Sequence, residues 1–322
     1  MRYYEIINEG GNAFKNPDID NLIRRINRDE IKPTLKNIAN DLKIPGIDYN
    51  YLLTHLMGST LKGPTSGDID IAVNAEQYYV PFAPKLVIAF PKSVLNNIAA
   101  IVRQKLGAEY VVTDGLPGGQ INVAWPILGN ITNGLVQVDF IHGDAEWLKF
   151  SHHSPGKDVS PYKGVWISTL MGLLAKLRKD FEAYNAAGER VARCGLQYDL
   201  EQGLHRVWEI RLKQGTSKVD PDVWETQLGK MIDTGMVVNI NKVPRFSRIG
   251  YIKTPEVVIE MLLGKKYNLS DIDTFEKLWG IVKNKYPDKI DEIKDRLAEA
   301  LLRSGLKNEM SKDEIVAQIN AL

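Results

Sequence analysis

The chain contains a single cysteine, Cys194, so no disulfide bond can form within it. Small secreted proteins that cannot build a large core depend on disulfides, and this sequence is excluded from that class. A lone cysteine also fits a reducing compartment. We expect Cys194 to pack as a small hydrophobic side chain rather than to act as a nucleophile.

The sequence also lacks a long apolar run. No stretch approaches the roughly 20 apolar residues that a membrane-spanning helix requires, and no secretory hydrophobic region opens the chain. These two absences predict a soluble protein of the cytoplasm that has no membrane partner.

An excess of one charge is absent as well. The 41 Lys and Arg residues balance 40 Asp and Glu residues, which leaves a net charge of +1. This balance excludes the global positive field that is typical of many nucleic-acid-binding proteins, although a local basic patch remains compatible with it. The 322 residues and the 44% hydrophobic content are sufficient for one large or two ordinary domains with real cores.

The spacing of apolar residues indicates both helices and strands. Residues 17–43 predict two helices separated at Pro33, and residues 94–106 predict an amphipathic helix. Gly115 to Gly119 is typical of a hairpin turn. Strands are expected at residues 109–113, 120–125 and 135–141. This order predicts an α/β (α+β) fold with a small mixed β-sheet and flanking helices.

We expect three parts along the chain. Residues 1–48 are expected to form an N-terminal helical segment, and residues 49–160 are expected to form the domain that contains the small sheet. A helical stripe begins after Trp166, so residues 161–322 are predicted to form a mostly helical C-terminal domain that is a candidate for substrate binding. One short β-prone patch lies near residues 236–252.

The stretch from Gly58 to Ile71 is the most informative part of the sequence. Asp68 and Asp70 are separated by one residue on a predicted strand, so their carboxylates project from the same face. Two carboxylates side by side repel each other unless a cation neutralises them, and Mg²⁺ prefers such oxygen ligands. A structural Ca²⁺ loop is the less favoured interpretation, because residues 71–73 supply no further side-chain oxygens.

A phosphate-binding feature precedes these carboxylates. The backbone N–H groups around Gly58 and Ser59 are able to receive a polyphosphate if a helix or tight turn follows them. The same short segment therefore combines a candidate triphosphate site with a candidate metal site.

Asp139 is a candidate for a third carboxylate. It lies within the hydrophobic strand predicted at residues 135–141, on the same face as Gln137. If this strand pairs beside the strand of Asp68 and Asp70, the three carboxylates converge, as two-metal nucleotidyl transfer requires. The alternative is that Asp139 only forms a salt bridge with a lysine at the rim of the core.

Together these residues resemble the active-site signature of the DNA polymerase β-like nucleotidyltransferase superfamily. The likeness is closest to the polymerase X type, because Gly58-Ser59, Gly63 and Ser66-Gly67-Asp68-Ile69-Asp70 occur in order, although the spacing is one residue shorter than expected there. The segment from Tyr162 to Thr169 is similar to the tyrosine-containing segment beside the incoming nucleotide of that group. The resemblance covers about residues 50–180.

The resemblance implies a nucleotidyltransferase palm that holds two Mg²⁺ or Mn²⁺ ions. By similarity Asp68 and Asp70 bind both metals, and Asp139 binds the catalytic metal and assists deprotonation of the acceptor hydroxyl. Ser59 would contact the triphosphate. The nucleotide-binding candidates are Gly58, Ser59, Lys62, Ser66, Gly67 and Lys176, the last because it lies beside a helical leucine stripe.

The expected function is transfer of a nucleotide from a nucleoside triphosphate such as ATP to an acceptor hydroxyl. A 3′ end of RNA or DNA is the favoured acceptor, and a protein or small-molecule hydroxyl is the alternative. A catalytically inactive member that serves as a binding or virion module is the rival from another class. The intact carboxylates argue against it, since clustered carboxylates are costly to keep without a purpose.

Two smaller signals remain. Residues 1–11 resemble the leader of proteins packaged in T4-like phage heads, with Ile7-Asn8-Glu9 as the processing site, so a phage origin would place the protein in the host cytoplasm or the virion. His152 and His153 lie in a polar stretch, and we expect this histidine pair to be solvated rather than to bind metal.

Overall fold

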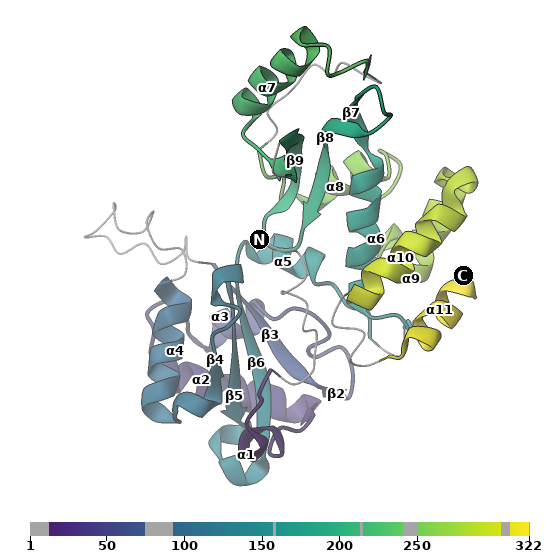
Figure 1. Cartoon of the computed structure of the whole chain (residues 1–322). Coiled ribbons are helices and arrows are strands. Elements are labelled where there is room, and N and C mark those ends of the chain that lie inside the picture. The colour runs from purple at the N-terminus through teal and green to yellow at the C-terminus, as the bar shows by residue number, and fades with distance from the viewer. Residues whose placement is uncertain are drawn as a thin grey trace. The chain divides into compact units, whose positions relative to one another are not determined.

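The computed structural model describes residues 13–74, 93–156, 159–212, 215–240, 250–303 and 310–321. The chain forms a mixed α/β structure (Figure 1). It divides into two compact units: the first comprises residues 1–169 and 270–322, and the second comprises residues 170–269. The proposed phage-type leader lies outside the described residues.

A four-stranded sheet forms the centre of the first unit. Its strand order is β3 (Asp68–Val73), β6 (Leu135–His142), β5 (Gln120–Pro126) and β4 (Val111–Val112). β3 pairs with β6 in parallel, whereas the other two pairings are antiparallel. A 3₁₀ turn at Leu116–Gly118 joins β4 to β5. The small mixed sheet and its hairpin are therefore confirmed.

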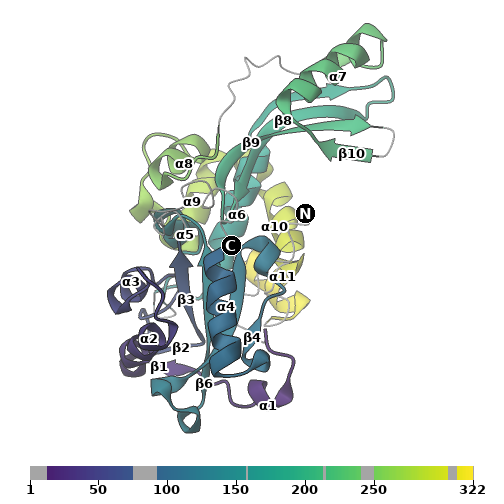
Figure 2. The same cartoon turned by 90° about the vertical axis from the view of Figure 1, so that its left-hand side faces the viewer.

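The two faces of this sheet differ in chemistry. Apolar side chains fill one face and pack against α2 (Arg28–Leu42), α3 (Tyr49–Thr54) and α4 (Ser93–Lys105), and Figure 2 shows α4 running along the sheet. The inward residues of the strands are Ile69, Ile71, Val73, Ile121, Val123, Trp125, Val136, Val138 and Phe140. Because strand side chains alternate, their neighbours Asp68, Asp70 and Asp139 lie on the opposite face.

The N-terminal helices differ from the prediction in one respect. Two helices are present, α1 (Pro17–Asp20) and α2, with the short strand β1 (Ile26–Asn27) between them, but Pro33 lies inside α2 instead of separating them. A proline inside a helix costs about 3 kcal/mol. Four buried side chains of α2 outweigh this cost at roughly 1.5–3 kcal/mol each, namely Ile31, Leu35, Ile38 and Leu42.

Five more helices complete the first unit, one of which continues into the second. They are α5 (Ala145–Ser151), α6 (Gly164–Leu177), α9 (Phe275–Lys285), α10 (Ile290–Arg303) and α11 (Lys312–Asn320). Ser311 caps the start of α11: its backbone N–H donates to the Glu314 carboxylate at 2.7 Å, and its hydroxyl accepts the backbone N–H of Glu314 at 3.2 Å. α9 begins after Thr274, whose hydroxyl accepts the backbone N–H of Lys277.

Residues 161–322, which were expected to be mostly helical, also contain a β-sheet that was not predicted, and this sheet lies in the second unit. The sheet has five strands in the order β10 (Gly215–Lys218), β9 (Gly203–Leu212), β8 (Arg190–Asp199), β7 (Lys179–Tyr184) and β11 (Asn239–Ile240). Only β11 falls in the expected β-prone patch. The helices are the end of α6, α7 (Pro221–Asp233) and α8 (Pro255–Leu262).

The strands of the second unit were missed because their two faces are both mixed. Cys194, Trp208 and Ile210 pack with Trp224 of α7, whereas the alternating positions carry charged residues such as Arg193 and Glu209. Buried apolar residues also occur at consecutive positions, such as Val191 and Ala192 of β8 and Val207 and Trp208 of β9, so these strands lack the strict period of two that identifies a strand in a sequence.

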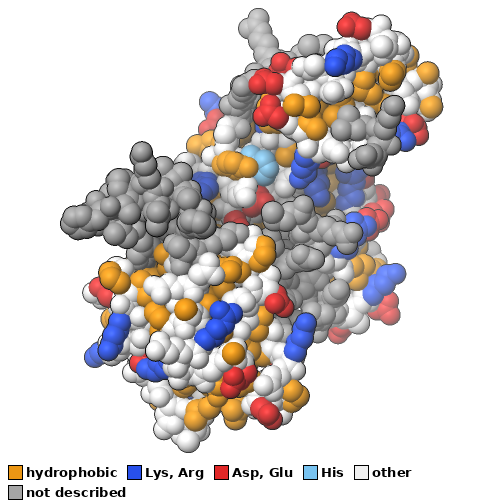
Figure 3. Space-filling view, turned by 60° about the vertical axis from the view of Figure 1, so that its left-hand side comes forward, with side chains coloured by type: hydrophobic (Ala, Val, Ile, Leu, Met, Phe, Trp, Pro, Cys, Tyr) orange, Lys and Arg blue, Asp and Glu red, His pale blue; other side chains and the backbone are white. Residues whose placement is uncertain are grey.

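The molecular surface carries both signs of charge. Figure 3 shows Lys and Arg side chains interspersed with Asp and Glu side chains on the face that it draws, in keeping with the net charge of +1. Within the described residues, the structure contains no helix of the length and apolarity needed to cross a bilayer.

Candidate functional site

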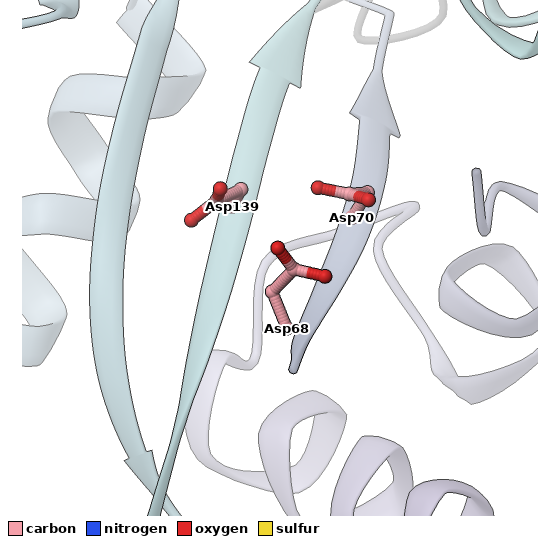
Figure 4. Close-up of side chains that lie close together, drawn as sticks. All are labelled: Asp68, Asp70 and Asp139. Carbon is pink, nitrogen blue, oxygen red and sulfur yellow. The ribbon is translucent and has the colours of Figure 1, made fainter. Parts of the chain in front are cut away.

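The parallel pairing of β3 with β6 brings the three predicted aspartates together. Asp70 lies directly opposite Asp139, and Asp68 lies opposite Gln137. One carboxylate oxygen of each aspartate lies within 4.8 Å of the others. Figure 4 shows the three side chains on the two neighbouring strands. The predicted convergence of the carboxylates is confirmed, and the group is a candidate metal site.

Gly58 lies against the carboxylate of Asp70. Its backbone is in the left-handed region, with φ of +60°, and a Cβ atom at this position would overlap Oδ2 of Asp70. The surrounding backbone fixes the approach: Met57 donates its N–H to the carbonyl of Asp70 at 2.9 Å, and the Thr60 hydroxyl accepts the Asp70 N–H at 3.3 Å. Only glycine fits this position without displacing the aspartate.

A tight turn follows Gly58 and Ser59, as a phosphate-binding backbone requires. Thr60 donates its N–H to Met57 at 3.3 Å, and Lys62 donates its N–H to Ser59 at 3.0 Å. No helix begins here, because the chain continues through turns to β2 (Thr65–Ser66).

Asp139 is almost completely buried, at 2% exposure, and is held by side-chain amides. Asn122 on β5 donates to Oδ1 at 2.7 Å, and Gln137 donates to Oδ1 and Oδ2 at 3.0 and 3.1 Å. Gln120 adds a longer contact of 3.4 Å to Oδ2. Burial and the nearby charge of Asp68 raise the pKa of Asp139 to about 8, although the amide hydrogen bonds oppose the shift.

Asp68 is also buried, and its burial raises its pKa. The positive charges of Lys163 and Arg25 oppose this shift. Arg25 is held near the site by Thr65, since its guanidinium donates to the Thr65 hydroxyl at 3.0 Å and to the Thr65 carbonyl at 3.1 Å. The two buried carboxylates therefore favour a proton or a cation in their surroundings.

Lys62 lies beside the carboxylates at the end of the turn. Its ammonium donates to the backbone carbonyl of Ser154 at 2.8 Å. Partial burial of the ammonium lowers the pKa of Lys62, and the charge of Asp70 opposes this effect. The Ser154 hydroxyl in turn accepts the N–H of Gly164 at the beginning of α6 at 3.2 Å. The loop before α6 therefore fixes the ammonium of Lys62, the lysine that is predicted to bind phosphate, through the carbonyl of Ser154.

The remaining predicted site residues have different surroundings. Ser66 is buried and, within the described part of the chain, its hydroxyl has no hydrogen-bond partner. A Cβ atom on Gly67 would lie 3.3 Å from the guanidinium of Arg25. Lys176 lies in the last turn of α6 and belongs to the second unit, so its role as a nucleotide ligand stays a prediction.

Tyr162 and the histidine pair are partly buried. The Tyr162 ring lies 4.9 Å from the Trp166 ring and 4.8 Å from the Phe275 ring, which makes it part of an aromatic cluster. A ring nitrogen of His153 lies 2.9 Å from the carbonyl of Asp273, and one of His152 lies 3.3 Å from that of Leu148. The expectation that both histidines are solvated is therefore wrong, because both side chains are partly buried and contact backbone carbonyls.

Sequence analysis missed several residues of the site. Gln120 and Asn122 alternate with the buried residues of β5, so the strand period of two would have placed both on the face of Asp139. Arg25 and Ser154 are distant from the motif in sequence, and no local pattern identifies them.

The donor set fits hard divalent cations. Three carboxylates supply oxygen ligands, and their burial and mutual repulsion favour a cation among them. Comparisons of the chain with protein family models, curated proteins and solved structures found no match. The chemistry of the site is therefore inferred from its own geometry.

Proposed function

We propose that this protein is a metal-dependent nucleotidyltransferase of the DNA polymerase β-like type. It transfers an NMP or dNMP from a nucleoside triphosphate to an acceptor hydroxyl and releases pyrophosphate. The observation that carries the proposal is the convergence of Asp68, Asp70 and Asp139 within 4.8 Å, directly beside the glycine turn at Gly58.

The carboxylates suit two Mg²⁺ or Mn²⁺ ions. Asp68 and Asp70 would bind both ions, and Asp139 would bind the ion nearest the acceptor. When bound, the ions neutralise the charge of the triphosphate and lower the pKa of the attacking hydroxyl. The raised pKa of Asp139 supports this assignment, since burial without a compensating cation disfavours its charged form.

The triphosphate would lie along the turn after Gly58. The backbone of Gly58 and Ser59 would face the triphosphate, and Lys62 supplies a positive charge. Arg25 supplies a second positive charge close to Asp68. These groups match a polyanionic substrate better than a neutral one.

In the transfer step the acceptor oxygen forms a bond to the α-phosphorus. The bond from the α-phosphorus to the bridging oxygen breaks, and its electron pair leaves with pyrophosphate. Asp139 would assist the loss of the hydroxyl proton as a carboxylate, because a cation bound among the three aspartates favours its charged form.

The acceptor is proposed to be a 3′ end of RNA or DNA in the cytoplasm, with the second unit as the candidate for binding it. That unit presents charged strands rather than the helical surface that the sequence predicts. A protein or small-molecule hydroxyl is the alternative acceptor, and the test below distinguishes these.

The test is a transfer assay with nucleoside and deoxynucleoside triphosphates labelled at the α-phosphate, in Mg²⁺ or Mn²⁺. The acceptors are tRNA, single-stranded RNA and DNA primers, and the Asp68→Asn/Asp70→Asn protein is the control. Label in a nucleic-acid band that the control lacks supports the proposal. Label on protein would show that the acceptor is a protein hydroxyl instead of a nucleic acid. If no acceptor receives label, the enzymatic function is refuted and a binding or virion module is favoured.

A further inference from the structure

We infer that Asn122 and Gln137 are positioning residues that orient the Asp139 carboxylate for metal binding. The inference rests on the metal-binding part of the proposed function. It concerns neither the nucleotide nor the acceptor, and it assigns a role to two residues outside the motif that contains Asp68 and Asp70.

The register of the sheet creates the contact. Asn122 on β5 lies directly opposite Asp139 on β6, and Gln137 lies two residues before Asp139 on the same face of β6. All three side chains are buried, with exposures of 7%, 4% and 2%. Because β5 and β6 form the centre of the sheet, the backbone offers these amides little freedom to move away.

The two amides contact both oxygens of the carboxylate. Asn122 donates to Oδ1 at 2.7 Å, and Gln137 donates to Oδ1 and Oδ2 at 3.0 and 3.1 Å. With hydrogen bonds from two directions, the carboxylate cannot rotate about its χ2 bond without losing at least one of them. Of the about four lone-pair sites of a carboxylate, the two amides occupy both on Oδ1 and one on Oδ2. The remaining site on Oδ2 faces only the long contact of Gln120, so Oδ2 is the atom that would bind a cation.

The donors around Asp139 differ from those around its neighbours. Lys163 and Arg25 lie near Asp68, and Lys62 lies near Asp70, so these two carboxylates have cations close by. The donors to Asp139 are neutral amides. A neutral donor fixes the orientation of a carboxylate without cancelling its charge, whereas a lysine or arginine in the same place would compete with a metal ion.

The contact distances predict a ranking of effects. Asn122 and Gln137 make the short contacts, whereas the 3.4 Å contact of Gln120 is near the limit of a hydrogen bond. Replacing Asn122 or Gln137 should therefore weaken metal binding strongly, and replacing Gln120 should weaken it little.

The experiment measures Mn²⁺ binding by the loss of the free-ion electron paramagnetic resonance signal. The variants are Asn122→Leu, Gln137→Met and Gln120→Met, each similar in size to the native side chain. Gln197→Met is the control, because Gln197 lies in the second unit, where its amide oxygen accepts from Lys218. Thermal unfolding is recorded for each protein, and Asn122→Ser replaces Asn122→Leu if the latter fails to fold.

We expect Asn122→Leu and Gln137→Met to bind Mn²⁺ at least tenfold more weakly, or to lose one ion, while Gln120→Met and Gln197→Met bind like the wild type. Wild-type binding by folded Asn122 and Gln137 variants overturns the inference, as does an equal loss in the Gln120 variant. The transfer assay separates this inference from the proposed function. If the wild type transfers no nucleotide but the Asn122 and Gln137 variants bind Mn²⁺ more weakly, the positioning role is supported and the transferase function is refuted. If the wild type transfers nucleotide but these variants bind Mn²⁺ as the wild type does, the positioning role is refuted and the transferase function is supported.

Discussion

The backbone of Gly58 lies so close to Asp70 that a Cβ atom on the glycine would overlap Oδ2 of the aspartate. This contact joins the turn that would receive the triphosphate to a carboxylate that would bind the metal. Since φ at Gly58 is +60°, any other residue is also strained there.

We predict that Gly58→Ala lowers kcat/KM for nucleotide transfer by about 100-fold, because a displaced Asp70 loses its metal geometry. Steady-state kinetics measure the effect. The matched control is Gly229→Ala in α7, where a Cβ atom meets nothing within 4 Å and alanine favours the helix. An active Gly58→Ala protein would contradict the proposed contact between turn and carboxylate.

Metal binding should raise the melting temperature of the protein, and the size of this rise should depend on Asp68. A ligand that binds only the folded state stabilises it, so Mg²⁺ or Mn²⁺ should raise the melting temperature of the wild type. Asp68→Asn removes one of the crowded buried carboxylates, whose burial raises its pKa. We expect this variant to melt higher than the wild type without metal and to gain little from added Mn²⁺. Equal gains in both proteins, measured by differential scanning fluorimetry, would count against the metal site.

Lys62 is predicted to bind the triphosphate rather than to take part in proton transfer. Its ammonium lies beside Asp70 and is held by the carbonyl of Ser154 at 2.8 Å. Lys62→Met should therefore raise KM for the nucleoside triphosphate roughly 10-fold or more, with a smaller change in kcat. Lys218→Met in the second unit serves as the charge control. A change in kcat alone would assign Lys62 a different role.

His152 should make the stability of the protein depend on pH. Burial lowers its pKa to about 4, whereas the unfolded chain titrates near 6.5. As the pH falls from 6.5 toward 4, the unfolded state binds the proton first, so the folded state loses stability. The loss should be about 1–3 kcal/mol, because His152 is only partly buried by its neighbours.

The comparison uses His152→Gln and urea unfolding at several pH values. The difference in unfolding free energy between wild type and variant at pH 8 should shift in favour of the variant by pH 4.5. A difference that stays constant over this range would show that His152 is protonated equally in the folded and unfolded states.

The sequence was sufficient to predict the centre of the site. Asp68, Asp70 and Asp139 each interrupt an apolar strand, and the period of two places them on one face. The parallel pairing of β3 with β6 then brings them together. The sequence alone does not determine this pairing, so the prediction had to assume it. The hairpin before β5 followed from its glycines in the same way.

Other features depend on contacts that no local pattern contains. Pro33 remains inside α2 because the helix buries four apolar side chains, and the strands of the second unit place buried apolar residues on both faces. The amides of Asn122 and Gln137 are ordinary polar residues in the sequence. Their importance appears only when the register of β5 and β6 places both beside a buried carboxylate.

The most direct test of the proposed site is anomalous diffraction from crystals grown with Mn²⁺ and a non-hydrolysable nucleoside triphosphate. The account predicts manganese peaks between Asp68, Asp70 and Asp139, with the triphosphate against the turn from Gly58 to Lys62. Absence of manganese and nucleotide from these carboxylates, at concentrations that saturate binding in solution, would contradict it.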